Sequence, residues 1–148
     1  MRRNSINCLV LTIVTVVLLN ASGLAQPNKD AHAIRKVMDE QTAAWNRGDL
    51  EGFMFGYWKS EKLKFVSGDK ITYGWQSTLD NYKKTYGTRA LMGTLTFTGL
   101  EIEVLSKDAA FVTGSWHLKR ENDEPKGKFT LLFRKFKEGW RIVTDHSS

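Results

Sequence analysis

The order of elements along this 148-residue chain predicts an α+β fold, in which three N-terminal helices pack on one face of a curved, mainly antiparallel sheet. Two observations carry this prediction. Apolar residues recur at helical spacing in the first part of the chain, whereas the part beyond residue 90 reads as long strands joined by short polar loops. Connections this short join antiparallel neighbours.

The first 25 residues have the three parts of a secretory signal peptide. Two arginines form the basic region, residues 8–19 form the apolar region, and small residues lead to a cleavage site after Ala25. The apolar run is shorter than the roughly 20 residues that a membrane span needs. We therefore expect an exported protein, periplasmic or secreted, whose single mature domain covers residues 26–148 and contacts no membrane after cleavage.

Charge and cysteine content narrow the class of protein. The whole chain has a formal net charge of +6, but basic and acidic residues alternate along it, as in residues 119–124. Nucleic-acid binding typically needs a clustered basic stripe, so nucleic acid is not expected as a partner. The single cysteine, Cys8, lies in the signal peptide. Packing must therefore hold the mature domain without disulfides, and oligomerisation can help it.

Helical spacing marks three segments. From Asp30 to Arg47, apolar residues lie three and four positions apart, and Gly48 is expected to end that helix. Asp49 is a suitable N-cap for a second, shorter helix that reaches Tyr57. The third helix is expected from Trp75 to Tyr86, closed by Gly87.

Strand patterns account for the rest of the chain. Two short strands flank a turn at residues 67–69 and predict a small hairpin, Leu63–Val66 with Lys70–Tyr73. The long strands that follow are expected at Leu91–Leu105, Ala109–Arg120, Lys126–Phe136 and Trp140–His146.

Three stretches of sequence resemble the SnoaL-like branch of the nuclear transport factor 2-like superfamily. They are AWNRGDLE at residues 44–51, GSW at 114–116, and GWRIVTDHSS at 139–148. The resemblance covers the whole mature chain and implies a cone-shaped fold that encloses a pocket, as in ketosteroid isomerase and the association domain of calcium/calmodulin-dependent kinase II. This superfamily contains isomerases, dehydratases, cyclases, hydrolases, oligomerisation hubs and non-catalytic binders, so the fold leaves the function open.

The functional residues of two such relatives are not retained here. Ketosteroid isomerase has a tyrosine close to the position of Gln41. It also has an aspartate that acts as the catalytic base at the end of the first strand, which here is residues 66–67, and a second aspartate on an inner strand. No acid occurs between residues 128 and 135 of this chain. The association domain lines its pocket with arginines, which correspond to His117 and Leu131. The resemblance therefore gives no direct support for isomerase chemistry or carboxylate binding.

Periodicity alone does not decide which face of the 109–120 strand looks into the cone. The resemblance to the association domain favours the face of His117, and the same reasoning selects one face of each following strand. Aromatic residues of the helices would close the mouth, although such a stripe is also typical of an ordinary helix core. The predicted ligand pocket then consists of Trp45, Tyr57, Trp58, Trp75, Tyr82, Thr113, Ser115, Phe129, Leu131, Phe133 and Arg141.

His117 and Asp145 are the candidate catalytic pair. If both face inward, Asp145 would orient the imidazole of His117, which would move a proton. A strand histidine is more often without such a role, and His146 falls on the opposite face to Asp145, where a dimer interface or a terminal hydrogen bond would use it. The spacing of the three histidines gives no metal-binding motif, no nucleophile elbow is present, and no cofactor is expected.

Two functions of different classes follow. The first is an exported module that binds a small, partly apolar ligand in the cone and forms a homodimer through the outer face of the sheet; the missing catalytic carboxylates favour it. The alternative is a lyase or isomerase that acts through His117 and Asp145. A hydrogen bond between those two side chains inside an open cavity would favour the alternative.

Overall fold

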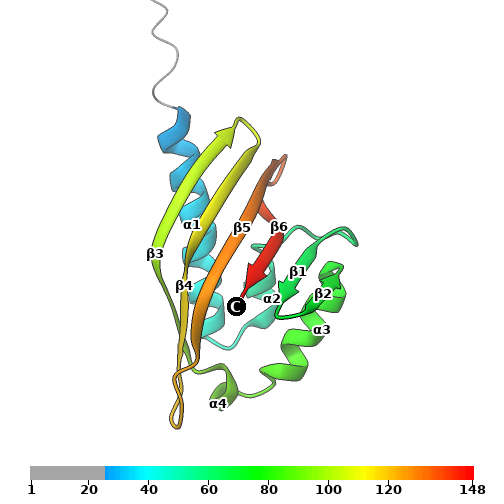
Figure 1. Ribbon diagram of the computed structural model, residues 1–148, viewed down its shortest axis with the longest axis vertical. Coiled ribbons are helices and arrows are strands. Elements are labelled where there is room, and N and C mark those ends of the chain that lie inside the picture. The colour runs from blue at the N-terminus through cyan, green and yellow to red at the C-terminus, as the bar shows by residue number, and fades with distance from the viewer. Residues whose placement is uncertain (1–25) are drawn as a thin grey trace, which may run out of the picture.

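The computed structural model describes residues 26–148, which form four helices and one six-stranded sheet (Figure 1). The predicted signal peptide lies outside the described residues. The helices are α1 (Gln26–Asn46), α2 (Leu50–Met54), α3 (Trp75–Thr85) and α4 (Arg89–Met92). The strands are β1 (Lys64–Ser67), β2 (Lys70–Tyr73), β3 (Thr94–Ser106), β4 (Ala109–Lys119), β5 (Lys126–Phe136) and β6 (Gly139–Ser147).

The joint between α1 and α2 depends on two consecutive residues. Gly48 has a φ of 85°, a left-handed conformation that glycine adopts without a Cβ penalty, and it ends α1. Asp49 then caps α2, because its Oδ1 accepts a hydrogen bond from the backbone N–H of Gly52 at 2.7 Å. The chain turns sharply here and brings α2 beside α1.

The sheet order is β2-β1-β6-β5-β4-β3, and β1 pairs with β6 in parallel, whereas the other neighbours are antiparallel. The last strand of the chain therefore lies in the middle of the sheet and joins the β1–β2 hairpin to the long meander. Figure 1 shows α1 running along one face of the curved sheet while the other face is left open. Helices on one side of a mainly antiparallel sheet define the α+β class that the sequence predicts.

A short helix occupies the start of the predicted strand from Leu91, so that prediction was wrong for residues 91–93. Thr88 caps α4 by accepting the backbone N–H of Leu91 at 3.3 Å. The Arg89 guanidinium donates to the carbonyl oxygen of Trp45 at 3.0 Å and so fixes α4 to the end of α1. Gly93 then turns the chain with a φ of 61°, and the strand β3 begins only after it.

A β-bulge in β6 changes which side chains face the helices. Leu132 pairs with Thr144 and Phe133 pairs with Ile142, so Val143 is an extra residue on β6. Ile142 and Asp145 are therefore both buried on the inner face, at 1% and 3% exposure, although they are three residues apart. Without the bulge, residues on one face would be two or four apart.

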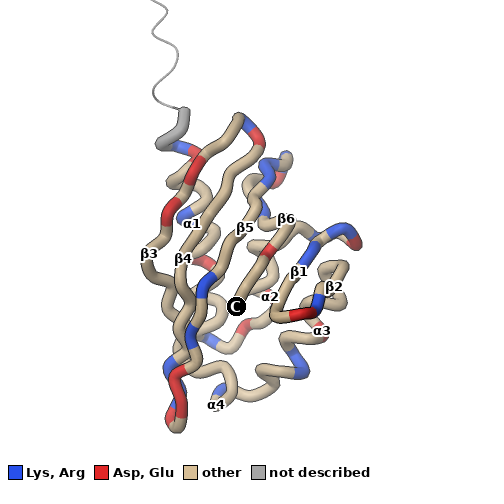
Figure 2. The backbone as a smooth tube through the Cα atoms, viewed as in Figure 1, with Lys and Arg blue, Asp and Glu red and all other residues tan. Residues whose placement is uncertain are grey.

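The core lies between α1 and the inner face of the sheet, and one buried carboxylate joins the two layers. Asp30 of α1 accepts hydrogen bonds from Lys135 Nζ at 2.7 Å and from Trp140 Nε1 at 3.2 Å. Among the described residues, no helix is both long and apolar enough to cross a membrane. Figure 2 shows basic and acidic residues interspersed over the strands, helices and loops.

Candidate functional site

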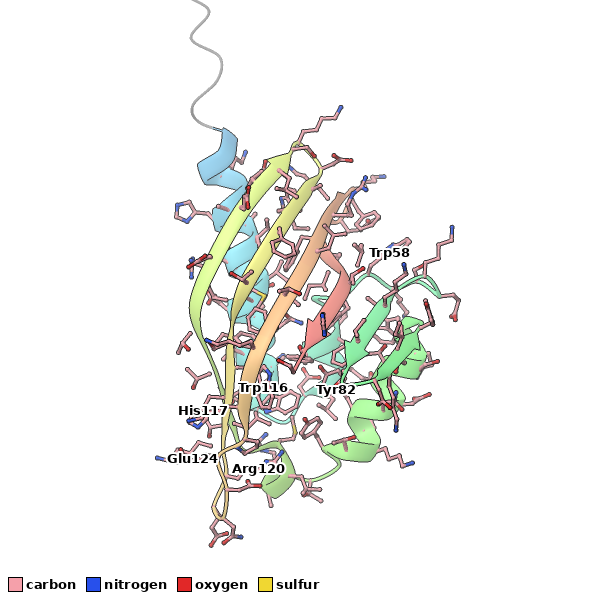
Figure 3. All side chains as sticks on the ribbon, viewed as in Figure 1. Trp58, Tyr82, Trp116, His117, Arg120 and Glu124 are labelled. Carbon is pink, nitrogen blue, oxygen red and sulfur yellow. The ribbon has the colours of Figure 1, made fainter. Side chains whose placement is uncertain are left out.

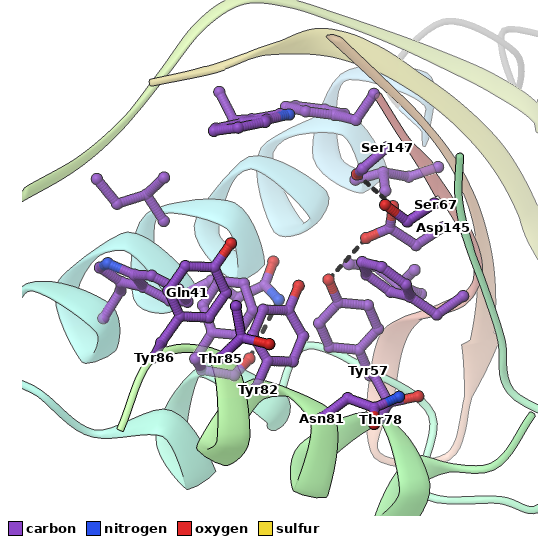
Figure 4. Close-up of a pocket in the computed structure, with 18 of the residues that line it drawn as sticks. Gln41, Tyr57, Ser67, Thr78, Asn81, Tyr82, Thr85, Tyr86, Asp145 and Ser147 are labelled. Atoms are coloured by element: carbon purple, nitrogen blue, oxygen red, sulfur yellow. Dashed lines mark hydrogen bonds between the residues drawn. The ribbon is translucent and has the colours of Figure 1, made fainter. Parts of the chain in front are cut away.

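A cavity of about 630 Å³ opens between the inner face of the sheet and the helices (Figure 4). This volume lies within the range of small-molecule sites, roughly 300–1,000 Å³. Its walls are largely aromatic and come from α1, the α2–β1 segment, α3 and the sheet. The aromatic lining residues are Trp45, Phe53, Tyr57, Phe65, Tyr82, Tyr86, Phe97, Trp116 and Phe129.

Asp145 places a carboxyl group in this apolar cavity. The Tyr57 hydroxyl donates to its Oδ2 at 2.7 Å, and the Ser147 hydroxyl donates to its Oδ1 at 2.6 Å. Burial raises the pKa of the Asp145 carboxyl to about 6, although the hydrogen bonds from Ser147 and Tyr57 and the nearby charge of His146 lower it. At neutral pH the group is therefore mostly a carboxylate, and near pH 6 it can exchange a proton.

Three tyrosines surround the same space. Figure 4 shows the hydroxyl ends of Tyr57, Tyr82 and Tyr86 pointing into the cavity from the side of the helices. Burial raises the pKa of all three hydroxyls above the usual value, and for Tyr57 and Tyr82 the nearby charge of Asp145 raises it further. All three therefore stay neutral at physiological pH, and each can donate or accept a hydrogen bond.

Gln41 of α1 brings an amide group to the cavity wall. Its Nε2 donates to the carbonyl oxygen of Phe53 at 3.1 Å, which fixes the orientation of the amide because a carbonyl only accepts. Oε1 is then the other end. It is buried and has no hydrogen-bond partner within the described residues. Figure 4 shows this side chain directed at the space between the tyrosines.

Part of the predicted pocket lines this cavity. Aromatic and apolar residues from α1, the loop after α2, α3 and β5 do so, together with the acid of β6. They are Trp45, Tyr57, Tyr82, Phe129, Leu131 and Asp145. Edge-to-face contacts hold the helix side in place, with the ring centroids of Trp45 and Phe53 5.1 Å apart and those of Phe53 and Tyr82 5.3 Å apart.

Four other predicted pocket residues lie elsewhere. Trp58 stacks on Phe136 with centroids 5.3 Å apart, and Trp75 donates through Nε1 to the carbonyl oxygen of Met54 at 2.9 Å. Phe133 is fully buried among core residues and does not reach the cavity. Arg141 lies on the other side of the bulge, beside a smaller groove of about 380 Å³ between α1 and α2.

The inner face predicted for β4 was wrong. Val112, Trp116 and Leu118 point inward, so Thr113, Ser115 and His117 lie on the outer face. Ser115 accepts a hydrogen bond there from Lys128 Nζ at 2.8 Å.

His117 and Asp145 consequently lie on opposite faces of the sheet. His117 Nε2 is 3.2 Å from an oxygen of Glu124, in the loop before β5. Figure 3 shows His117 and Glu124 at the outer edge, away from Tyr82 and Trp116. The structure therefore excludes direct proton transfer between His117 and Asp145.

Sequence reasoning missed several polar or aromatic lining residues, among them Gln41, Tyr86 and Trp116. Tyr86 had a usable signal, because it continues the helical spacing of Trp75, Leu79 and Tyr82. Gln41 stands at a core position of α1, and a polar residue at a core position is itself informative. Within the described residues, no group of three or more His, Cys, Asp or Glu is placed to hold a metal ion.

Comparisons with known proteins identify the family. A family model described as a SnoaL-like domain matches residues 34–148. A nuclear transport factor 2-like protein of unknown function from Shewanella oneidensis MR-1 is 47% identical, with a TM-score of 0.76, over 79% of this chain and 97% of that one. The chain therefore belongs to the SnoaL-like family of the nuclear transport factor 2-like superfamily.

More distant structures share the fold. A nuclear transport factor 2-like superfamily protein from Salmonella enterica serovar Typhimurium LT2 is 22% identical, with a TM-score of 0.67, over 82% of this chain and 91% of its own. A nuclear transport factor 2-like protein of unknown function from Pseudomonas putida KT2440 is 15% identical, with a TM-score of 0.70, over 83% and 88%. No curated protein matches this sequence. The two structures confirm the predicted fold class.

Proposed function

We propose that this protein binds a small, partly apolar ligand inside the cavity, with the Asp145 carboxylate as its polar anchor. The observation that carries the proposal is a carboxyl group only 3% exposed, held by two hydroxyl groups in an aromatic cavity. Burying a charge is costly. A small number of polar groups that converge in a mainly apolar pocket is typical of ligand recognition.

A neutral aromatic probe, 2-phenylethanol, tests whether the cavity accepts small molecules. We expect NMR shift changes at cavity residues such as Tyr57 and Phe129, and at least about tenfold weaker binding in Leu131→Trp, which fills the cavity from β5. Leu132→Trp is the matched control, because the next side chain of β5 faces outward. Circular dichroism checks that both variants fold.

A second variant narrows the entrance without changing the core. Ser67 is exposed, lines the cavity and ends β1, so Ser67→Trp should also weaken binding of the probe. Shift changes confined to the outer face of the sheet, or probe binding unchanged in both folded cavity variants, would contradict the proposal.

The enzyme alternative survives in a changed form. A general acid or base that works near neutral pH needs a pKa close to that pH, and the pKa of Asp145 is about 6. Asp145 also accepts a hydrogen bond from Tyr57. His117 lies on the other face of the sheet, next to Glu124, and takes no part. A lyase or isomerase would then use Asp145 alone to move the proton. Deuterium uptake next to the carbonyl of a cyclic ketone that depends on Asp145 would favour this alternative, and its absence would favour simple binding.

Export and dimerisation are further parts of the proposal. Export is supported by the signal-peptide pattern of residues 1–25. N-terminal sequencing of the exported protein should find that it begins at Gln26. A product that begins at Met1 would contradict the cleavage.

A homodimer is supported by the outer face of the sheet, where Phe111 is 37% exposed. The protein should sediment at twice the mass of its chain. Sedimentation as a monomer would contradict the dimer.

A further inference from the structure

The buried polar groups of the cavity differ in the hydrogen-bond capacity that they leave for a ligand. Several of the buried donors are already used within the protein. Trp45 Nε1 donates to the carbonyl oxygen of Met92 at 3.0 Å, and the Thr78 hydroxyl donates to that of Gly74 at 2.8 Å. The hydroxyls of Tyr57 and Ser147 both donate to Asp145. These four donors are therefore not available to a ligand, whereas the hydroxyl groups of Ser67 and Thr85 belong to exposed residues of the lining.

The acceptors of the cavity, by contrast, have capacity left. Each Asp145 oxygen receives one hydroxyl donor, and a carboxylate has about four acceptor positions in all. Gln41 Oε1 is buried and accepts no hydrogen bond within the described residues. The hydroxyls of Tyr82 and Tyr86 can serve either way. A ligand that complements these groups must therefore bring donors.

The charge of Asp145 narrows the ligand class further. Within the described part of the chain, no Lys, Arg or His forms an ion pair with this carboxylate. Its hydrogen-bond donors are neutral, and the nearby charge of His146 acts on it without forming an ion pair. A buried carboxylate without an ion-pair partner is costly. Lys70 and Lys84 also line the cavity, but both are exposed at the mouth, where solvent and salt screen their charge.

From these features we propose that the ligand is an organic amine, whose ammonium group binds the Asp145 carboxylate while its apolar body lies among the aromatic side chains. An ammonium group has three donors and no acceptor, which matches the acceptors left over in the cavity. It also supplies an ion-pair partner, which the carboxylate lacks within the described residues. Aromatic faces attract cations, and rings from α1, α3 and the sheet surround this space. The inference rests on the proposed binding function and specifies its ligand class.

Three probes of the same shape and different charge test the inference. They are 2-phenylethylamine, the neutral 2-phenylethanol and the anionic 3-phenylpropanoate, titrated by calorimetry at pH 7.5. The amine should bind at least about tenfold more tightly than the alcohol, because a charge-assisted hydrogen bond is roughly twice as strong as a neutral one. The anion should bind most weakly, because it meets Asp145.

Asp145→Asn should reduce the preference for the amine over the alcohol to less than about threefold, because the amide has no charge to attract the ammonium group. Glu124→Gln is the matched control, because it makes the same carboxylate-to-amide change on the outer face and should alter none of the three affinities. Circular dichroism confirms that both variants are folded.

The outcomes separate this inference from the function on which it rests. If the alcohol or the anion binds as well as the amine, and binding is lost in Leu131→Trp, the cavity binds ligands but the amine inference is wrong. If no probe of any charge binds, both the inference and the binding function are wrong. An amine preference that persists in the folded Asp145→Asn variant overturns the role given to this carboxylate.

Discussion

Deletion of Trp140–Ser148 is expected to unfold the whole domain. This segment contains all of β6 except Gly139. Among the described strands, β6 alone links the β1–β2 hairpin to the rest of the sheet, because it lies between β1 and β5. Trp140 and Ile142 are 2% and 1% exposed. Losing a buried tryptophan or isoleucine side chain typically costs about 2–5 kcal/mol, and domains of this size have only about 5–15 kcal/mol of stability.

Circular dichroism and thermal melting of the truncated protein test this expectation. Loss of the cooperative transition would support it, and a melt close to that of the parent would show that β6 is peripheral. Trp140→Ala separates side-chain packing from strand pairing and should lower the free energy of unfolding by about 3–5 kcal/mol. Thr144→Ala on the outer side of the same strand is its control, with an expected change of less than about 1 kcal/mol.

The regular elements could be predicted because each has a clear hydrophobic period. The helical spacing around Trp45 and Tyr82 and the long strand patterns place nearly every helix and strand within a few residues. The exception is α4, whose four residues are too few to show a period. Its signal is instead the N-cap Thr88 followed by Gly93, which resembles an ordinary loop in the sequence.

The inner face of β4 could have been predicted from the strand itself. Ala110, Val112 and Leu118 share one face, and the opposite face has mostly polar side chains, including His117 and Lys119. Binary patterning therefore favours the apolar set as the inner one. The resemblance to a relative's arginine-lined pocket favoured the other face. That prediction was wrong because pocket residues of one superfamily member do not fix which face of this strand is apolar.

Asp145 faces the cavity for a reason that strand alternation alone could not supply. Regular alternation places Arg141 and Val143 on the same face as Asp145, whereas the structure has Ile142 on that face, because the bulge at Val143 shifts the pattern. Asp145 faces inward as expected, but the neighbours expected on its face were wrong. Contacts such as Gln41 with the Phe53 carbonyl depend on tertiary geometry and leave no local pattern.

Asp145→Asn is expected to make the folded protein more stable at pH 8, by about 1–3 kcal/mol. Burial raises the pKa of this carboxyl from 3.8 to about 6, so ionisation in the folded state works against folding. A shift of one pKa unit corresponds to about 1.36 kcal/mol, and the whole shift to about 3 kcal/mol. The lower end of the expected stability gain allows for a weaker hydrogen bond between Ser147 and the asparagine side chain, which has one acceptor oxygen where the carboxylate has two.

The pH dependence of this effect has a definite sign. Between about pH 4 and 6 the folded protein binds more protons at Asp145 than the unfolded chain does, so this group lowers the free energy of unfolding as the pH rises. Its favourable contribution is complete below the unfolded pKa of about 4 and is lost as the pH rises through about 6. The stability advantage of Asp145→Asn should therefore be largest at pH 8 and vanish near pH 4.

Urea unfolding of parent and variant at pH 4, 6 and 8 measures this difference. Taking the difference removes the contributions of titrating groups that do not interact with Asp145. Asp39→Asn, on the exposed side of α1, is the matched control and should show no such pH-dependent gain. An equal advantage at every pH would mean that packing, not charge, is responsible. A gain that is absent at pH 4 and present at pH 6 and 8 would show that the parent retains a destabilising charge in its cavity, as binding sites commonly do where function opposes stability.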